Sequence, residues 1–247
     1  MRYKRMITPV ICTFLATVML ILGCVSPAQE QVKKGDSFLK QQQWDEAIAA
    51  YNEAIELDPK NVAEVNPKLT TAYTNRGTAY DFKGDYDKAI ADYTKAIELD
   101  PKLAIAELNM KLATSYNLRG NVYNSQDDYD KAIADYTEAI ELDPNVSWVY
   151  NERGTAHFKK GDYVRAIVDF TKAIELNPKL DLAYYNRGLV YSLKGDYDKA
   201  IADYTRAIEI DPKLSAAYNS RGLAYYKKCD FDKAADDLRK AKELGYE

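Results

Sequence analysis

Arginine and aspartate recur in step along this sequence. Five arginines are each followed sixteen residues later by an aspartate: Arg76 and Asp92, Arg119 and Asp135, Arg153 and Asp169, Arg187 and Asp203, Arg221 and Asp237. A guanidinium can donate two parallel hydrogen bonds to one carboxylate, so each pair predicts an ion pair between neighbouring helices. The alternative is a ladder of arginines that binds an anionic ligand. Lys34 and Ala50 stand where a sixth pair would fall, and this joint change favours ion pairs.

Few other residues suit catalysis. His157 is the one histidine, so the sequence offers neither a histidine metal site nor a Ser-His-Asp arrangement, and we expect it to pack in or near the core. Cys229 stands at a turn, where we expect a thiol without a role. No glycine-rich stretch resembles a phosphate loop, and the net charge of -4 gives no basis for nucleic-acid binding. We therefore expect no enzyme, no cofactor and no bound metal.

The same spacing of small residues recurs six times. Glycines at 35, 77, 120, 154, 188 and 222 are each followed twelve residues later by an alanine and nineteen residues later by a second alanine. Proline follows the second alanine by five residues in the first five copies, and the last three steps between glycines are 34 residues long. Such a period predicts stacked units of one supersecondary motif.

This pattern resembles the tetratricopeptide repeat (TPR), a 34-residue helix-turn-helix unit with glycine, tyrosine, alanine and proline at fixed places. The resemblance implies an all-α fold, a right-handed α-solenoid of six units that binds partner proteins or peptides. With the glycine at position 8, the units span 28–61, 70–103, 113–146, 147–180, 181–214 and 215–247. Between them, 62–69 is expected to form a loop or a single turn. The insert 104–112 is expected to lengthen the next helix by about two turns, with Leu103, Ala106, Met110 and Ala113 at helical spacing.

Local signals place the ends of the helices. Asp-Pro and Asn-Pro dipeptides before the first helix of a repeat predict an N-cap followed by proline in the first turn. The Gly-Asp stretches, such as Gly84-Asp85, predict a turn and an aspartate cap for the second helix. Within that helix, Tyr86, Ala89, Ile90, Tyr93, Ala96 and Ile97 fall on one apolar face. The last repeat has Ala235 and Lys242 in place of isoleucine, as expected for a polar terminal cap.

The resemblance also implies a binding groove, since positions 2, 5, 9, 12 and 13 of the first helices face a groove in this family. Here they give Asn117, Asn121, Asn124, Trp148, Asn151, Thr155, Phe158, Tyr185, Leu189, Asn219 and Tyr226. Asparagine amides suit the backbone of an extended peptide, and aromatic rings suit its side chains. The alternative for Trp148 and Phe158 is packing between adjacent repeats. Repeats three to six lack lysine or arginine at positions 2 and 6, so we expect an internal segment rather than a free C-terminus.

The N-terminus resembles that of a bacterial lipoprotein. Three basic residues precede an uncharged apolar stretch that ends in Leu22-Gly23-Cys24. We expect residues 1–23 to be a cleaved signal, Cys24 to carry palmitate-like acyl chains, and 24–27 to be a short tether. The alternative is an uncleaved membrane anchor. The expected function is a scaffold at a bacterial membrane surface, outside the cytoplasm, in envelope or pilus assembly; a self-associating structural spacer is the second possibility.

Overall fold

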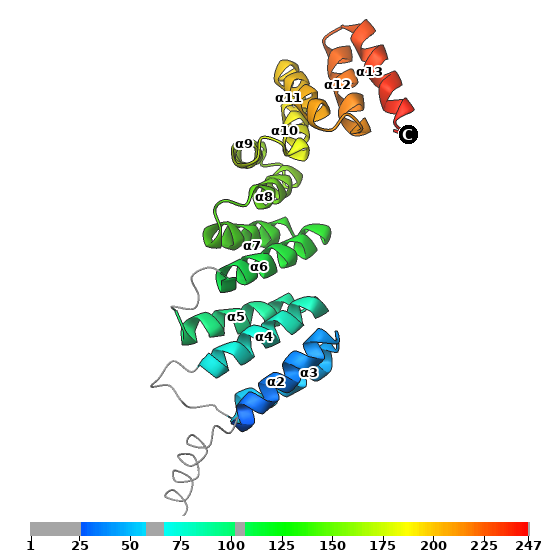
Figure 1. Cartoon of the computed structure of the whole chain (residues 1–247). Coiled ribbons are helices and arrows are strands. Elements are labelled where there is room, and N and C mark those ends of the chain that lie inside the picture. The colour runs from blue at the N-terminus through cyan, green and yellow to red at the C-terminus, as the bar shows by residue number, and fades with distance from the viewer. Residues whose placement is uncertain (1–25, 58–66, 102–106, 247) are drawn as a thin grey trace, which may run out of the picture. The chain divides into compact units, whose positions relative to one another are not determined.

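The computed structural model describes residues 26–57, 67–101 and 107–246, apart from the side chains of 67–69. These residues form twelve helices and no strand (Figure 1). The predicted signal, Cys24, residues 62–66 of the first insert and residues 104–106 of the second lie outside the described residues. The helices are α2 (Pro27–Lys40), α3 (Trp44–Leu57), α4 (Pro67–Lys83), α5 (Tyr86–Leu99), α6 (Glu107–Ser125), α7 (Tyr129–Leu142), α8 (Ser147–Lys159), α9 (Tyr163–Leu176), α10 (Asp181–Leu193), α11 (Tyr197–Ile210), α12 (Ser215–Lys227) and α13 (Phe231–Glu243).

Successive helices pair as the repeat predicts. The chain forms two compact units that divide within α6, between Ser115 and Tyr116. In each unit a first helix packs against the second helix of its own repeat, and a second helix packs against the first helix of the next repeat. The pairs α8 with α9 and α12 with α13 show this arrangement clearly (Figure 1). None of the described helices is long and apolar enough to cross a membrane.

The core of each of the first five repeats depends on a glycine facing an aromatic ring. A Cβ atom added at Gly188 would lie 2.7 Å from Cε1 of Tyr204, closer than atoms can approach. Tyr204 is only 1% exposed, and the flanking Ala200 and Ala207 are fully buried. The same contact recurs at the equivalent glycines before the last repeat. The paired helices therefore approach closely, and this approach requires glycine at this position.

The prediction for the start of the first helices is wrong for α8, α10 and α12, whereas α4 does begin at the proline of an Asn-Pro dipeptide. α8 begins at Ser147 after Val146, whereas Asp143 is the C-cap of the preceding α7. The Asp143 carboxylate accepts a hydrogen bond of 3.1 Å from the backbone N–H of Asn145, and Asn177 and Asp211 make the equivalent bond. An aspartate or asparagine that bonds the amide two residues on stabilises a turn, so the helix starts only after that turn. Aspartate at the N-cap of the second helices is confirmed, for example at Asp162, which accepts from the N–H of Arg165.

The two inserts between repeats differ in detail from the prediction. α6 has 19 residues against 13 in α8, which confirms the longer helix. In the inserted part of the helix, however, Leu108 and Leu112 are buried and Met110 is exposed, so this part of the apolar face is rotated from the predicted one; Ala113 is buried as predicted. α4 begins at Pro67, which gives the insert 62–69 a helical turn at its end.

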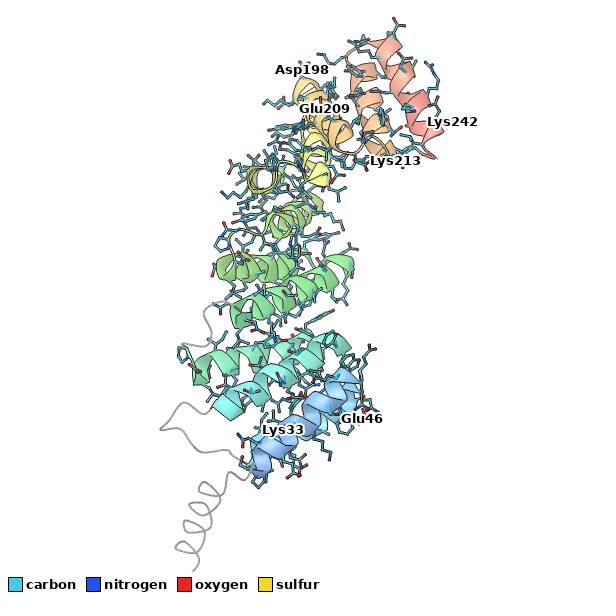
Figure 2. The ribbon with its side chains drawn as sticks, in the orientation of Figure 1. Lys33, Glu46, Asp198, Glu209, Lys213 and Lys242 are labelled. Carbon is cyan, nitrogen blue, oxygen red and sulfur yellow. The ribbon has the colours of Figure 1, made fainter. Side chains whose placement is uncertain are left out.

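The two ends of the described chain have distinct polar features. α2 begins at Pro27, inside the predicted tether, because Ser26 and Gln29 form a capping box. On α13, Ala235 and Lys242 are exposed, in agreement with a polar terminal cap. Exposed charges occur on several repeats, as the labelled side chains in Figure 2 illustrate: Lys33, Glu46, Asp198, Glu209, Lys213 and Lys242.

Candidate peptide-binding face

The recurring arginines and aspartates form ion pairs between the two helices of a repeat. In the fifth repeat, Nε of Arg187 donates to Oδ2 of Asp203 at 2.8 Å, and Nη2 donates to Oδ1 at 2.8 Å. The other four pairs have the same two hydrogen bonds, at 2.6–2.9 Å. The predicted ion pairs are confirmed, and all five are partly buried.

The third nitrogen of the guanidinium joins the neighbouring repeat. Nη1 of Arg187 donates to Oγ1 of Thr171 at 3.0 Å, and three other arginines make the corresponding bond: Arg76 to Asn52, Arg153 to Thr137, and Arg221 to Thr205. The hydrogen bond with Asp203 raises the pKa of Arg187 above its usual value. Because each nitrogen of these four arginines already donates within the protein, the alternative of an anion-binding ladder does not hold.

The asparagines predicted to bind peptide backbone are not all available. Asn151 is buried, and its Oδ1 accepts from Nδ2 of Asn186 at 3.1 Å, so it joins the fourth repeat to the fifth. Asn121 accepts a hydrogen bond of 2.7 Å from the hydroxyl of Tyr136. The Oδ1 atoms of Asn117 and Asn124 have no hydrogen-bond partner among the described residues, but both atoms are buried and Asn117 is only 2% exposed, so a ligand does not reach them in this structure. Asn219 is half-buried.

The predicted aromatic and apolar residues divide into two groups. Phe158 packs beside Phe170 of its own repeat and Val190 of the fifth repeat. This confirms the alternative for Phe158, packing between adjacent repeats. Tyr185 lies 5.9 Å from Tyr204, ring centre to ring centre, and Leu189 packs against the same cluster. Thr155 donates its hydroxyl to the backbone oxygen of Asn151. Trp148 and Tyr226 remain 44% and 56% exposed, so they are the predicted aromatic residues that are most accessible to a ligand.

Three further exposed leucines occupy groove positions. Leu182, Leu193 and Leu223 stand at positions 2, 13 and 9, and about half or more of each side chain is exposed. The predicted groove did not include them, although their position numbers alone identify them. Together with Trp148 and Tyr226 they give large exposed apolar side chains on three consecutive first helices, α8, α10 and α12.

This arrangement can bind a ligand and offers little for catalysis. Exposed apolar side chains on neighbouring helices can bury the side chains of a partner, and such contacts often dominate binding energy. Among the described residues, no group of three histidine, cysteine or acidic side chains could hold a metal ion. Paired helices, a repeated interior and a variable outer face define a helical repeat protein of the α-solenoid class.

Comparisons with known proteins agree with this class. Models of the family described as "Tetratricopeptide repeat" match residues 70–103, 113–146, 135–168 and 182–214, and a model described as "TPR repeat" matches 35–81 and 154–195. The chain belongs to the tetratricopeptide repeat family. No curated protein sequence matches it.

Solved structures show the same fold. The protein MamA is 34% identical, with 72% of this chain and 93% of that chain covered and a TM-score of 0.57. YrrB, described as "a TPR protein with an unusual peptide-binding site", is 26% identical, with 79% and 92% covered and a TM-score of 0.58. A tetratricopeptide repeat protein from Parabacteroides merdae, 22% identical, shares the fold with 88% and 79% covered and a TM-score of 0.56.

Proposed function

We propose that this protein is a non-catalytic scaffold that binds an extended, partly apolar segment of a partner protein. The observation that carries the proposal is the row of exposed apolar side chains at groove positions of α8, α10 and α12, from Trp148 to Tyr226. A soluble surface rarely keeps such side chains together unless they are covered in use. The peptide-binding site named for YrrB supports the same use of this fold.

The chemistry of the face favours an internal segment of the partner. Positions 2 and 6 of the first helices in repeats three to six carry no lysine or arginine that would hold a terminal carboxylate. Among the predicted asparagines, Asn121 is exposed, and its amide can bond the backbone of an extended chain. The proposed ligand is therefore an extended chain with apolar side chains and no free C-terminus at the site.

We also propose that the scaffold works at a bacterial membrane surface outside the cytoplasm, held there by a lipid on Cys24. The support is the sequence Leu22-Gly23-Cys24 after an uncharged apolar stretch. Envelope or pilus assembly would need such an anchored scaffold. Mass spectrometry of the protein from bacterial membranes is expected to find an acylated Cys24 at the N-terminus. An intact Met1 or an unmodified Cys24 would contradict the anchor without affecting the peptide-binding proposal.

Selection from a random peptide library tests the binding function. The full chain, kept soluble in detergent, is the bait, and we expect enriched peptides to share apolar residues and to bind equally well when their C-terminus is amidated. Light scattering of the same sample separates the rival function, a self-associating spacer. Defined oligomers with no enriched peptide would overturn the proposed scaffold.

A further inference from the structure

The fourth repeat has residues at positions 11, 19 and 22 that no other repeat has there. In repeats two, three, five and six, a tyrosine at position 11 lies under a lysine at position 19, with 5.2–5.3 Å from Nζ to the ring centre. In the fourth repeat these positions hold His157 and Arg165, and Val168 replaces the alanine found at position 22 in the first, second, third and fifth repeats. An imidazole is smaller than a phenol ring, so these substitutions change the space between the helices.

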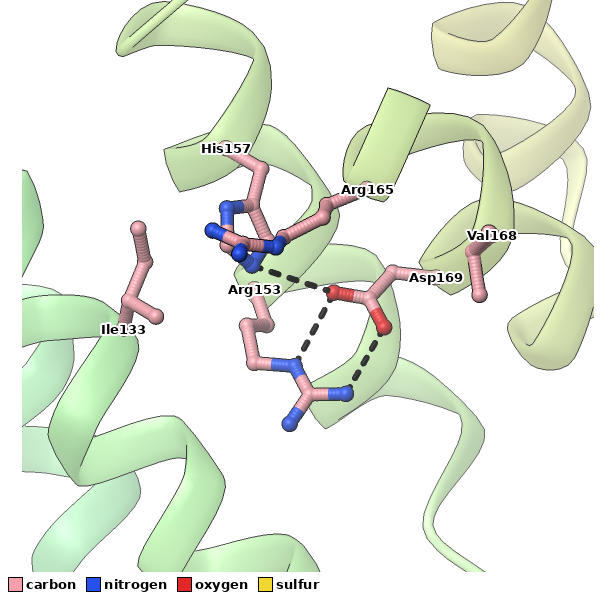
Figure 3. A pocket seen from close by; sticks show the side chains of 6 residues that line it. All are labelled: Ile133, Arg153, His157, Arg165, Val168 and Asp169. Atoms are coloured by element: carbon pink, nitrogen blue, oxygen red, sulfur yellow. Dashed lines mark hydrogen bonds and ion pairs between the residues drawn. The ribbon is translucent and has the colours of Figure 1, made fainter. Parts of the chain in front are cut away.

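A pocket of about 360 Å³ lies beside these substitutions (Figure 3). It is lined by Ile133 of α7, by Arg153 and His157 of α8, and by Arg165, Val168 and Asp169 of α9. A volume of this size is at the lower end of the range of small-molecule sites. None of the predicted groove residues lines it, and four of its six residues come from second helices, so it is a different site from the proposed peptide-binding face.

His157 brings an unused polar atom to this pocket. The residue is 7% exposed, and its Nδ1 has no hydrogen-bond partner among the described residues. Its Nε2 lies 3.9 Å from Oδ2 of Asp169, the contact drawn in Figure 3. A buried nitrogen without a partner is costly, because it loses its bond to water and gains none. Nδ1 is covered by its neighbours, so a ligand in the pocket must displace a side chain to supply the missing partner.

The charges around the pocket favour an anion. Arg153 and Asp169 neutralise each other through two hydrogen bonds of 2.8 and 2.9 Å. The second arginine, Arg165, is exposed and reaches Asp162 at 3.2 Å through one nitrogen, which leaves much of its guanidinium in solvent. Ile133 and Val168 provide apolar walls. The pocket therefore combines a cation, an unused imidazole nitrogen and an apolar surface.

We propose that this pocket binds a small organic carboxylate with an apolar body, either as a free acid or as an acidic side chain of a partner protein. The carboxylate accepts hydrogen bonds from Arg165 and from Nδ1–H of His157, and the apolar body lies against Ile133 and Val168. The site extends beyond the proposed scaffold function, because it can be occupied whether or not the first-helix face holds a peptide.

The groups around His157 determine the direction of its pKa shift. Burial lowers the pKa of His157; Asp169 and Asp162 oppose that shift, and Arg153 and Arg165 add to it. A bound carboxylate at Nδ1 stabilises the imidazolium, so binding raises the pKa of His157 and becomes tighter as the pH falls.

The single histidine makes the test direct. The full chain, in detergent and labelled with ¹⁵N-histidine, gives one pair of imidazole nitrogen signals. Titration with benzoate is expected to move the Nδ1 signal to a plateau, with a Kd on the order of 1 mM, and to shift the imidazole titration to higher pH. Benzamide, which has the same shape without the charge, is expected to leave the signal unchanged. An unmoved signal with benzoate, or an equal response to benzamide, would overturn the proposal.

Variants assign the effect to this pocket. His157→Tyr restores the residue of four other repeats and is expected to abolish benzoate binding seen by saturation-transfer NMR. Arg165→Gln is expected to weaken binding at least tenfold. The matched control is Tyr191→His, which places a second imidazole beside Lys199 and Ala202 and is expected to give a signal that benzoate does not move. Full benzoate binding by His157→Tyr, or an equal response at residue 191, would contradict the site.

A second titration distinguishes the two sources of the carboxylate, a free acid and an acidic side chain of a partner protein. A short peptide with one aspartate between apolar residues is added to the benzoate complex. Displacement of benzoate identifies a protein side chain as the natural ligand, and no displacement identifies a free acid. The double variant Trp148→Ala and Tyr226→Ala is expected to leave the benzoate response unchanged, so failure of the peptide-binding face and failure of this pocket remain distinguishable.

Discussion

The contact between the two helices of a repeat stays nearly constant along the chain, whereas the outer face of the first helices changes in every repeat. Glycine against an aromatic ring, and arginine against aspartate, recur with almost the same distances. Position 2 of the outer face, however, is Thr114, Trp148, Leu182 and Ala216 in the last four repeats. Stability is supplied by the repeated contact, so the other face is free to vary with the ligand.

The largest expected effect distinguishes a tyrosine of the interior from one of the face. Tyr204→Ala removes a ring that is 1% exposed and is expected to cost about 3 to 5 kcal/mol in free energy of unfolding. Tyr226→Ala removes a ring that is 56% exposed and is expected to cost less than about 1 kcal/mol. Urea unfolding followed by circular dichroism compares them. Equal losses of unfolding free energy in the two variants would contradict the distinction between interior and face.

A middle-sized effect is expected for the ion pairs. A double-mutant cycle on Arg187 and Asp203 should give a coupling of about 1 to 3 kcal/mol, because their side chains are 17% and 9% exposed and share two hydrogen bonds. The control is the exposed pair Lys199 and Asp196, at 3.4 Å, with an expected coupling under about 0.5 kcal/mol. A coupling near zero for Arg187 and Asp203 would mean that the two are solvated independently.

A smaller effect is expected at the turn inside the last repeat. Cys229 has a φ of 62°, a left-handed conformation that three other repeats fill with glycine. Cys229→Gly is expected to raise the free energy of unfolding by about 0.5 to 1 kcal/mol. The reverse change, Gly195→Ala at a φ of 81°, should lower it by about 1 kcal/mol. Thermal unfolding measures both, and a Cys229→Gly protein that unfolds more easily would contradict this account of the turn.

The smallest effect is the pH dependence that His157 contributes. Burial lowers its pKa, so the unfolded chain binds a proton more readily than the folded protein. Stability from this residue is therefore complete above a pH of about 6.5, the ordinary value for histidine, and is lost as the pH falls below it. His157→Tyr should remove this component of the urea midpoint between pH 7 and pH 5. An identical slope in both proteins would show that His157 is not desolvated.

Much of the fold could be predicted because each repeat restates the same local contacts. Gly188 and Tyr204, or Arg187 and Asp203, are sixteen residues apart in one helical hairpin, so spacing alone fixes their meeting. The starts of the first helices could not be placed from the Asp-Pro signal, because the aspartate carboxylate is used by the turn before the helix.

The site was harder to predict, since it depends on contacts between repeats. Asn151 has the right position for a ligand, but it is bonded to Asn186 of the next repeat. The substitution of His157 for tyrosine is visible in the sequence, whereas the pocket also needs Ile133 of the preceding repeat. A face residue remains free only if it is still exposed once the repeats have packed together. The spacing of residues in the sequence does not predict this exposure.

The affinity of a selected peptide for a face variant tests the central claim most directly. The variant carries Trp148→Ala, Leu182→Ala and Tyr226→Ala, and Leu57→Ala is the control, an exposed apolar residue of similar exposure on a second helix. Calorimetry on the full chain in detergent should show binding at least tenfold weaker, about 1.4 kcal/mol, for the face variant and unchanged binding for the control. Unchanged affinity in a face variant of full helix content would contradict the assignment of the outer face as the binding surface.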